Sequence, residues 1–190
     1  MSLSHDDPLL DATRASVMAV GVRRTTMSEV ARRAGVSRQT AYRYHPDVAS
    51  LLSELMTREF GRVIATATER TAGLPTGRER VVETLGLGAE LLAAEPLFER
   101  ILDVDPELLL PYVVERLGQV QQTVIAGLVD EIGRGVADGS IRPERPELLA
   151  AAVELIGRGF VVGAHAERPD NLDPWRELRF ALDGYLRPAT

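Results

Sequence analysis

The stretch TTMSEVARRAGVSRQTAYRYHPDVASLL, residues Thr25 to Leu52, contains two short amphipathic segments that meet at one glycine, Gly35. It lies in a basic part of an acidic chain. From Ala12 to Pro46 there are seven arginines and a single acid, Glu29, so this part carries a net charge of +6. The whole chain carries −6, and the remainder therefore carries −12. Because surface charge governs attraction to polyanions, the N-terminal part is expected to approach a polyanion and the rest to be repelled by one.

Local signals in this stretch predict a helix-turn-helix. Thr26 and Glu29 form a capping box, in which the Thr26 hydroxyl accepts from the Glu29 amide and the Glu29 carboxylate reaches back. Gly35 ends that helix because glycine readily adopts the left-handed conformation of a tight turn. Ser37 is the N-cap of the next helix, so the two helices cross at a steep angle. The residues expected to pack between them are Met27, Val30, Ala31, Ala34, Val36, Ala41 and His45.

Helical periodicity extends over nearly the whole chain, without sustained alternation or a hairpin signature, and predicts an all-α protein of about nine helices. The first is expected from Asp7 to Val20 and the long fourth from Asp47 toward Arg70. A sixth is expected from Leu97 to Leu102. A long seventh includes Val113 to Ile132 with Pro111 in its first turns, and the eighth, from Glu147 to about Ala166, is apolar on two faces.

The composition of the chain excludes several classes of protein and of functional site. A chain of 190 residues with 45% hydrophobic content can form a packed core. The absence of cysteine excludes disulfides, thiolate nucleophiles and thiolate metal sites. The N-terminal sequence MSLSHDDPLLD has no apolar core of a signal peptide, and no apolar run is long enough to span a membrane. We therefore expect a cytoplasmic protein, without a cofactor or a metal.

Three motifs follow one another near the N-terminus: LLDATRASVMAVG, then RRTTMSEVARRAGVSRQTAYRY, then PDVASLL at the start of a long helix. Through them, residues Leu9 to Leu52 resemble the DNA-binding domain of the TetR family of bacterial transcriptional regulators. The resemblance implies a helix-turn-helix DNA-binding domain over residues 1–53. It also implies an effector-binding and dimerisation domain over residues 54–190.

The helix after Gly35 is of a size that fits the major groove of DNA, where residues near its N-terminus reach base edges. We expect Arg38 and Gln39 to read bases, and Thr40 to contact a base or a phosphate. Backbone and groove-edge contacts are expected from Tyr42, Arg43 and Tyr44. At the helix N-termini, Thr26 and Ser37 are expected to present hydroxyls or amides to phosphate.

Two residues depart from the family pattern. His45 stands where the family usually has an aromatic or aliphatic residue, and we expect a buried histidine hydrogen-bonded to backbone rather than a phosphate contact. Val48 stands where the family commonly has a lysine, which removes one expected phosphate contact. Arg23 and Arg24, just before the second helix, are candidates to replace that charge.

By resemblance, a small molecule binds among the fourth to seventh helices and releases DNA by changing the spacing of two DNA-reading heads. An apolar lining would favour a hydrophobic effector. The candidate lining residues, chosen because they are large and apolar on those helices, are Leu85, Leu92, Phe98, Leu109, Tyr112 and Val124.

A single head reads only one half-site, and the eighth helix has more apolar surface than one monomer core needs, so we predict a homodimer. Its interface is expected on the eighth and ninth helices. The candidate contact residues are Leu149, Val153, Ile156, Phe160, Trp175, Leu178 and Leu182.

The sequence thus predicts a transcriptional regulator that binds a palindromic operator. The resemblance to the family favours a repressor. Two other classes are weighed against it. An architectural DNA-binding protein without an effector would need basic charge spread more widely than the −12 outside the head permits. An enzyme is disfavoured because His5, His45 and His165 are isolated, and no HExxH motif, nucleophile elbow or phosphate loop occurs. No catalytic residue is predicted.

Overall fold

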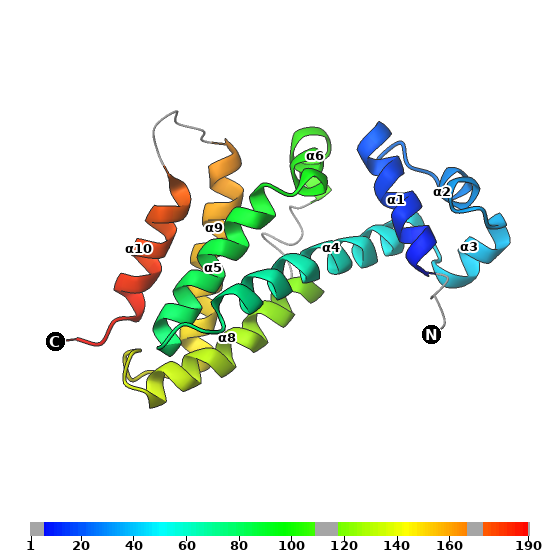
Figure 1. Cartoon of the computed structure of the whole chain (residues 1–190). Coiled ribbons are helices and arrows are strands. Elements are labelled where there is room, and N and C mark those ends of the chain that lie inside the picture. The colour runs from blue at the N-terminus through cyan, green and yellow to red at the C-terminus, as the bar shows by residue number, and fades with distance from the viewer. Residues whose placement is uncertain (1–5, 109–117, 167–172, 190) are drawn as a thin grey trace. The chain divides into compact units, whose positions relative to one another are not determined.

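The computed structural model describes residues 6–108, 118–166 and 173–189, and these residues form helices and contain no strand (Figure 1). The predicted all-α fold is therefore confirmed. The described elements are α1 (Asp6–Val20), α2 (Met27–Ala34), α3 (Arg38–Tyr44), α4 (Val48–Thr71), α5 (Gly77–Ala93), α6 (Pro96–Val104), the 3-10 helix η1 (Pro106–Leu108), α8 (Gln119–Ala137), α9 (Pro146–Ala166) and α10 (Pro174–Leu186).

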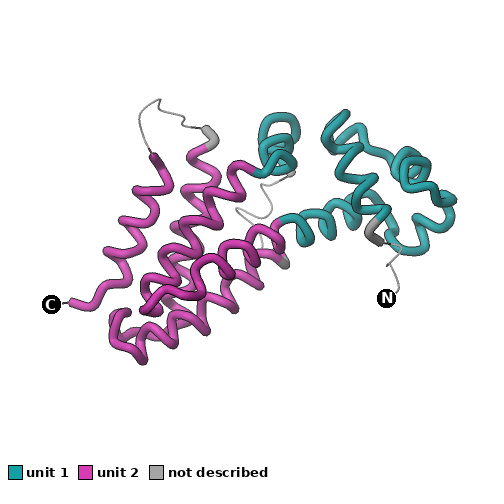
Figure 2. The backbone as a smooth tube through the Cα atoms, viewed as in Figure 1, with its two compact units in different colours: residues 1–59, 95–116 teal, residues 60–94, 117–190 magenta. Residues whose placement is uncertain are grey.

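The chain forms two compact units (Figure 2). The first comprises Met1–Glu59 and Glu95–Arg116, and the second comprises Phe60–Ala94 and Leu117–Thr190. The helix α4 contributes to both units. The first unit thus includes α6 and η1, a segment that lies far along the chain from the domain boundary expected at residue 53.

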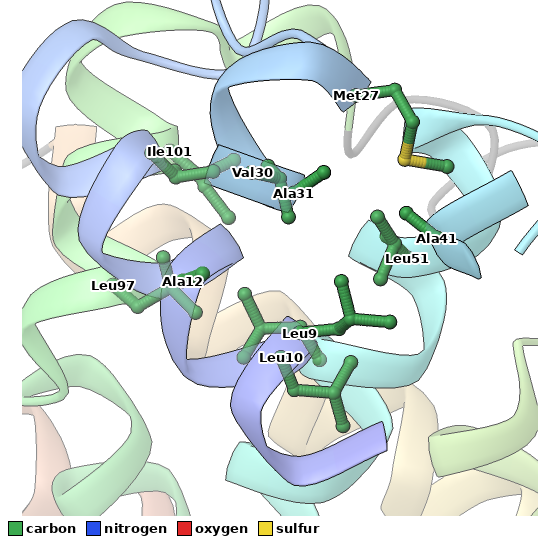
Figure 3. Close-up of a cluster of buried hydrophobic side chains, with 12 residues drawn as sticks. Leu9, Leu10, Ala12, Met27, Val30, Ala31, Ala41, Leu51, Leu97 and Ile101 are labelled. Carbon is green, nitrogen blue, oxygen red and sulfur yellow. The ribbon is translucent and has the colours of Figure 1, made fainter. Parts of the chain in front are cut away.

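In the first unit, short helices pack around one apolar cluster. Leu97 and Ile101 of α6 join side chains of α1, α2, α3 and α4 in this cluster (Figure 3). Both are almost completely buried, which shows that α6 supplies part of the core that holds the short helices together. The other buried members of the cluster are Leu9, Leu10, Ala12, Val17, Met27, Val30, Ala31, Ala41, Leu51 and Leu55.

In the second unit, α5 packs against α8, α9 and α10, and α9 also packs against α8 and α10. The helices α5 and α8 approach closely where two glycines face each other. A Cβ built on Gly77 would lie 2.4 Å from the Cα of Gly135, so a larger residue at position 77 would force the helices apart. The buried side chains of this unit include Val81, Leu128, Ile132, Ile141, Leu149, Val153, Leu178, Leu182 and Leu186.

The predicted helix boundaries agree with the structure in most places. The third helix ends at Tyr44, with His45 as its C-cap directly before Pro46. The sixth helix is longer than predicted by one residue before Leu97 and two after Leu102. Pro111 and Val113, where the seventh helix was expected to begin, lie outside the described residues. Within the parts of the chain that are described, no helix combines the length and the apolar character needed to cross a membrane.

Candidate nucleic-acid interface

The turn between α2 and α3 is built by local signals, as the sequence predicts. Gly35 has φ 69°, in the left-handed region. The amides of Gly35 and Val36 donate to carbonyls in the last turn of α2, at 3.3 and 3.0 Å. The Oγ of Ser37 then accepts from the amide of Thr40 at 3.0 Å and starts α3. These bonds satisfy backbone groups that helix ends would otherwise leave unpaired, and they define the angle at which α3 leaves α2.

The outward side of α3 has two arginine–tyrosine pairs. The Arg38 guanidinium carbon lies 5.3 Å from the ring centroid of Tyr42, and that of Arg43 lies 5.1 Å from the ring centroid of Tyr44. All four side chains are exposed, the tyrosines by 42% and 39% of their surface. A guanidinium held over an aromatic ring loses less conformational freedom when it binds a partner. These pairs are therefore preorganised groups on an open surface.

The remaining predicted contact residues lie beside these pairs. Gln39 is exposed, and Thr40 is half-buried with its hydroxyl oxygen 2.8 Å from Ser37 Oγ. Thr26 is the N-cap of α2, where its Oγ1 accepts from the Glu29 amide at 3.3 Å. The structure thus places Thr26, Ser37 and Thr40 at the N-terminal ends of α2 and α3. Their contacts with phosphate stay a prediction.

Glu29 neutralises part of the basic charge of α2. Its carboxylate accepts hydrogen bonds from Arg32 at 2.6 and 2.9 Å and from Arg33 at 2.7 Å. These bonds lower the pKa of Glu29 to about 2. The predicted return of this carboxylate to the backbone of Thr26 is wrong, because the two guanidinium groups are stronger partners than a neutral amide. Only the hydroxyl half of the capping box forms.

His45 is buried, with 4% of its surface exposed, and the predicted place in the core is confirmed. Its Nδ1 lies 3.6 Å from a carboxylate oxygen of Glu54 on α4. The backbone amide of His45 donates to the carbonyl of Ala41 and closes the last turn of α3. Burial removes this imidazole from the surface that α3 offers to a partner. The side-chain hydrogen bond to backbone that the sequence suggested stays a prediction.

Two arginines of the basic stretch, Arg14 and Arg23, form ion pairs with acidic residues of the segment 95–108. The sequence patterns did not predict these contacts. Glu95 caps α6 and also lies 3.0 Å from the Nη2 of Arg14 on α1. At the other end of the segment, Arg23 donates from Nε to Glu107 at 2.7 Å and lies 3.5 Å from Asp105. More than 80 residues separate the partners along the chain. The one available signal was the acidic character of residues 95–108, opposite in sign to the basic stretch from Ala12 to Pro46.

The arginines of the basic stretch therefore divide into two groups. Four of the seven, Arg14, Arg23, Arg32 and Arg33, have carboxylate partners. The other three, Arg24, Arg38 and Arg43, have no carboxylate partner among the described residues. Arg23 is thus a poor replacement for the lysine absent at Val48, whereas Arg24 is exposed. The uncompensated positive charge lies before α2 and on α3, where it can meet a polyanion.

The predicted lining residues of an effector pocket are only partly brought together. Leu85 and Leu92 on α5 and Val124 on α8 are half-buried in the second unit, where α5 and α8 pack against each other. Phe98 is buried in α6 and belongs to the first unit, whereas the other three residues belong to the second unit. Leu109 and Tyr112 lie outside the described residues.

The predicted interface residues on α9 and α10 need correction. Leu149, Val153, Leu178 and Leu182 have no exposed surface within the chain itself, so their side chains are core and are not available to a second copy. Ile156, Phe160 and Trp175 are half-buried. The large apolar side chains that these helices expose are Leu148 (48%), Leu155 (57%) and Phe180 (76%).

Comparisons with known proteins agree with this geometry. Residues 9–55 match the family model described as bacterial regulatory proteins, tetR family. The HTH-type transcriptional regulator Rv2250c of Mycobacterium tuberculosis is 34% identical over 194 residues, which cover 98% of this chain and 99% of that protein. The transcriptional repressor QsdR of R. erythropolis has a similar fold, with a TM-score of 0.71 at 15% identity over 96% and 94% of the two chains. For FadR from Bacillus subtilis in complex with stearoyl-CoA, the TM-score is 0.68 at 16% identity over 95% and 99%.

Proposed function

The chain belongs to the TetR family of bacterial transcriptional regulators, and we propose that it is a repressor that binds a palindromic operator and is released by a small, hydrophobic effector. The observation that carries this proposal is the exposed arginine–tyrosine face of α3, which follows a glycine turn and keeps its positive charge uncompensated. DNA recognition implies a cytoplasmic protein. We further propose a DNA-binding domain over residues 1–53 and an effector-binding and dimerisation domain over residues 54–190.

In the proposed complex, α3 lies in the major groove. Arg38 and Gln39, at its N-terminal end, read base edges, because a guanidinium and an amide each offer hydrogen-bond groups that distinguish bases. Tyr42, Arg43 and Tyr44 contact the sugar–phosphate backbone and the edge of the groove. The remaining proposed contacts are Thr40 with a base or phosphate, and Thr26 and Ser37 with phosphate.

We propose that two copies assemble through α9 and α10, so that two heads read the two halves of a palindrome. The support is the large apolar side chains that these helices expose to solvent, which a second copy would cover. Leu148 and Leu155 lie on α9 and Phe180 lies on α10, and these side chains replace the four buried residues as the proposed contacts. Ile156, Phe160 and Trp175 can contribute their exposed edges.

The proposed effector site lies in the second unit, near Leu85 and Leu92 of α5 and Val124 of α8. The support is the similar fold of FadR from Bacillus subtilis, whose structure contains stearoyl-CoA. Apolar side chains of this kind line most small-molecule sites in proteins. The helices α5 and α8 both pack against α9, so the proposed site adjoins the helix proposed for dimerisation.

The decisive experiment is selection of bound duplexes from a random pool by the purified protein at two salt concentrations, followed by sequencing. We expect a palindrome to be enriched by the wild type and lost by the double variant Arg38→Ala plus Tyr42→Ala. Arg70→Ala, which removes an exposed arginine at the end of α4, is the matched control and should leave the enrichment unchanged.

Two outcomes would reject the proposal. If no sequence is enriched at either salt concentration although duplexes are bound, the protein is an architectural DNA binder. If the double variant enriches the same sequence as the wild type, then α3 is not the element that reads DNA.

A further inference from the structure

Arg38 and Arg43 lie at opposite ends of α3 and contact different aromatic rings. Arg38 is the first residue of the helix, and its guanidinium lies over the ring of Tyr42, four residues later. Arg43 lies in the last turn, and its guanidinium lies over the ring of the next residue, Tyr44. All four side chains are exposed. The two arginines therefore place their charges at different ends of one surface.

The ring of Tyr42 positions the guanidinium of Arg38 beside the first turn of α3. Side chains of a helix tilt toward its N-terminus, so a tyrosine four residues later extends back toward Arg38. The Nη2 of Arg38 also donates to the phenol oxygen of Tyr42 at 3.4 Å. Because Arg38 is exposed and has no carboxylate partner among the described residues, its other N–H groups can donate to DNA.

The neighbouring hydroxyl groups are engaged in the start of the helix. The Oγ of Ser37 accepts from the amide of Thr40 at 3.0 Å and lies 2.8 Å from the Thr40 hydroxyl oxygen. By contrast, Arg38 and Gln39 are exposed. Of these two, Arg38 is the side chain restrained by a ring, so it loses less conformational freedom when it binds a base.

The donors of a guanidinium match the edge of one base. Arginine offers several N–H groups in a fixed plane and no acceptor. In the major groove, guanine presents two adjacent acceptors, O6 and N7, whereas adenine pairs its N7 with an amino donor. Thymine presents the acceptor O4 beside a methyl group, and cytosine presents an amino donor. A restrained arginine near the start of α3 is therefore complementary to guanine.

We propose that Arg38 recognises a guanine in each half of the operator, with two N–H groups donating to O6 and N7 while Tyr42 restrains the guanidinium. Arg43, in the last turn, binds phosphate and has no base preference. The proposal rests on the proposed function in one respect, namely that α3 enters the major groove of an operator. It goes further by naming the base and the residue that selects it.

The test uses the operator that the full-length wild type selects from the random pool. Competition binding measures the affinity for duplexes that each carry one base-pair change in one half-site. We expect one G·C pair at which every replacement weakens wild-type binding by about tenfold. Arg38→Ala should bind all four versions of that pair with affinities within about twofold of one another.

Modified guanines at that pair identify the edge that is recognised. 7-Deazaguanine lacks the N7 acceptor and should weaken wild-type binding severalfold. Hypoxanthine lacks only the amino group in the minor groove and should bind as tightly as guanine. In Arg38→Ala, 7-deazaguanine should have no further effect, because the variant and the modified base remove the same contact.

Two further variants separate base recognition from phosphate binding. Arg38→Gln should change the preferred base at this pair from guanine to adenine, because an amide is complementary to N6 and N7 of adenine. Arg43→Ala is the matched control, since it also removes an exposed arginine from an arginine–tyrosine pair. It should weaken binding of operator and scrambled duplexes by equal factors and leave every base preference unchanged. Both positions are exposed, so the variants should fold as the wild type does.

Three outcomes would overturn the proposal. Arg38→Ala could weaken operator and scrambled duplexes equally with all base preferences intact, which would assign Arg38 to phosphate. 7-Deazaguanine could bind as tightly as guanine, or the guanine preference could be lost in Arg43→Ala instead. Each of these results leaves the proposed function standing, because an operator is still selected. Failure to select any operator would reject both proposals.

Discussion

The buried carboxylate of Asp105 accepts a hydrogen bond from the backbone N–H of Val22 at 2.7 Å, although 83 residues separate them along the chain. Val22 lies in the turn that connects α1 to α2. Asp105 directly follows α6, whose apolar side chains belong to the core of the same unit. The structure of the DNA-reading unit therefore depends on a segment remote from the helix-turn-helix in sequence.

Removing this bond should destabilise the first unit. In Asp105→Ala the Val22 amide loses its buried acceptor and Arg23 loses one of its carboxylates, which should lower the free energy of unfolding by about 1–3 kcal/mol. Asp105→Asn keeps an acceptor oxygen and should cost less. Urea unfolding measures both variants, with Asp130→Ala, an exposed aspartate of α8, as the control. Equal stability of Asp105→Ala and the control would show that the bond contributes nothing.

Two glycines with positive φ should differ in their tolerance of alanine. Gly35 has φ 69° and open space around it, so Gly35→Ala should cost about 1–2 kcal/mol of unfolding free energy for the backbone conformation alone. In Gly21→Ala the new methyl group would also lie 3.0 Å from a carboxylate oxygen of Asp105 and 3.1 Å from Val104. We therefore expect Gly21→Ala to be the more destabilising change in urea unfolding.

A helical glycine provides the comparison for these two variants. Gly61 lies within α4, is exposed and has open space around it. Gly61→Ala should therefore stabilise the protein by about 0.5–1 kcal/mol. If Gly35→Ala were equally stabilising, the left-handed conformation at the turn would not be required.

Glu29→Gln should strengthen DNA binding. The change releases Arg32 and Arg33 from a carboxylate, so more positive charge faces the phosphates, and we expect a severalfold higher affinity at low salt. The slope of log affinity against log salt should become steeper by about one or two. Glu69→Gln, an exposed change in the second unit, is the control. An unchanged slope would place these arginines away from DNA.

The pKa of Glu29 gives this prediction a pH test. With a pKa of about 2, the carboxylate stays ionised in the folded protein throughout the range in which DNA binding is measured. The ratio of variant to wild-type affinity should therefore be equal at mildly acidic and neutral pH. A ratio that fell toward one as the pH decreased would mean that Glu29 is protonated in that range.

The pairing of Arg38 with Tyr42 predicts a graded series of variants. Arg38→Ala should weaken operator binding by about tenfold or more and relax the preference at one or two base pairs. Tyr42→Phe keeps the ring under the guanidinium and should have a small effect, whereas Tyr42→Ala should approach that of Arg38→Ala. Competition between operator and scrambled duplexes measures this series. Equal losses for Tyr42→Phe and Tyr42→Ala would instead assign the role to the hydroxyl.

The buried Glu154 should make stability depend on pH in an unusual direction for a carboxylate. Because its pKa is raised, the folded chain keeps this proton at pH values where the unfolded chain has released it. This contribution to the free energy of unfolding is therefore present below the ordinary pKa of 4.5 and is lost as the pH rises through the folded value. The stability of the wild type relative to Glu154→Gln should fall as the pH rises above 4.5 in urea unfolding. A rise would mean that the ion pair with Arg158 outweighs burial.

The helix-turn-helix and most of its exposed face could be predicted because the deciding signals are local. Gly35 and Ser37 lie within three residues of each other, and the backbone conformations they favour define the turn without help from distant residues. Helical periodicity likewise placed Ala41 in the core and Arg38 and Tyr42 outside. The return of Glu29 to the backbone was wrong because two arginines one turn away compete for the same oxygens.

The sequence by itself thus determined the helical fold, the turn at Gly35 and the composition of the α3 surface, since each follows from residues a few positions apart. Only the tertiary structure decided that Arg14 and Arg23 are compensated, because Glu95 and Glu107 reach them through packing of distant segments. It also decided that Leu149 lies inside and Leu155 outside on α9. Both apolar faces of that helix have the same periodicity, and only contact with α5, α8 and α10 distinguishes the buried one.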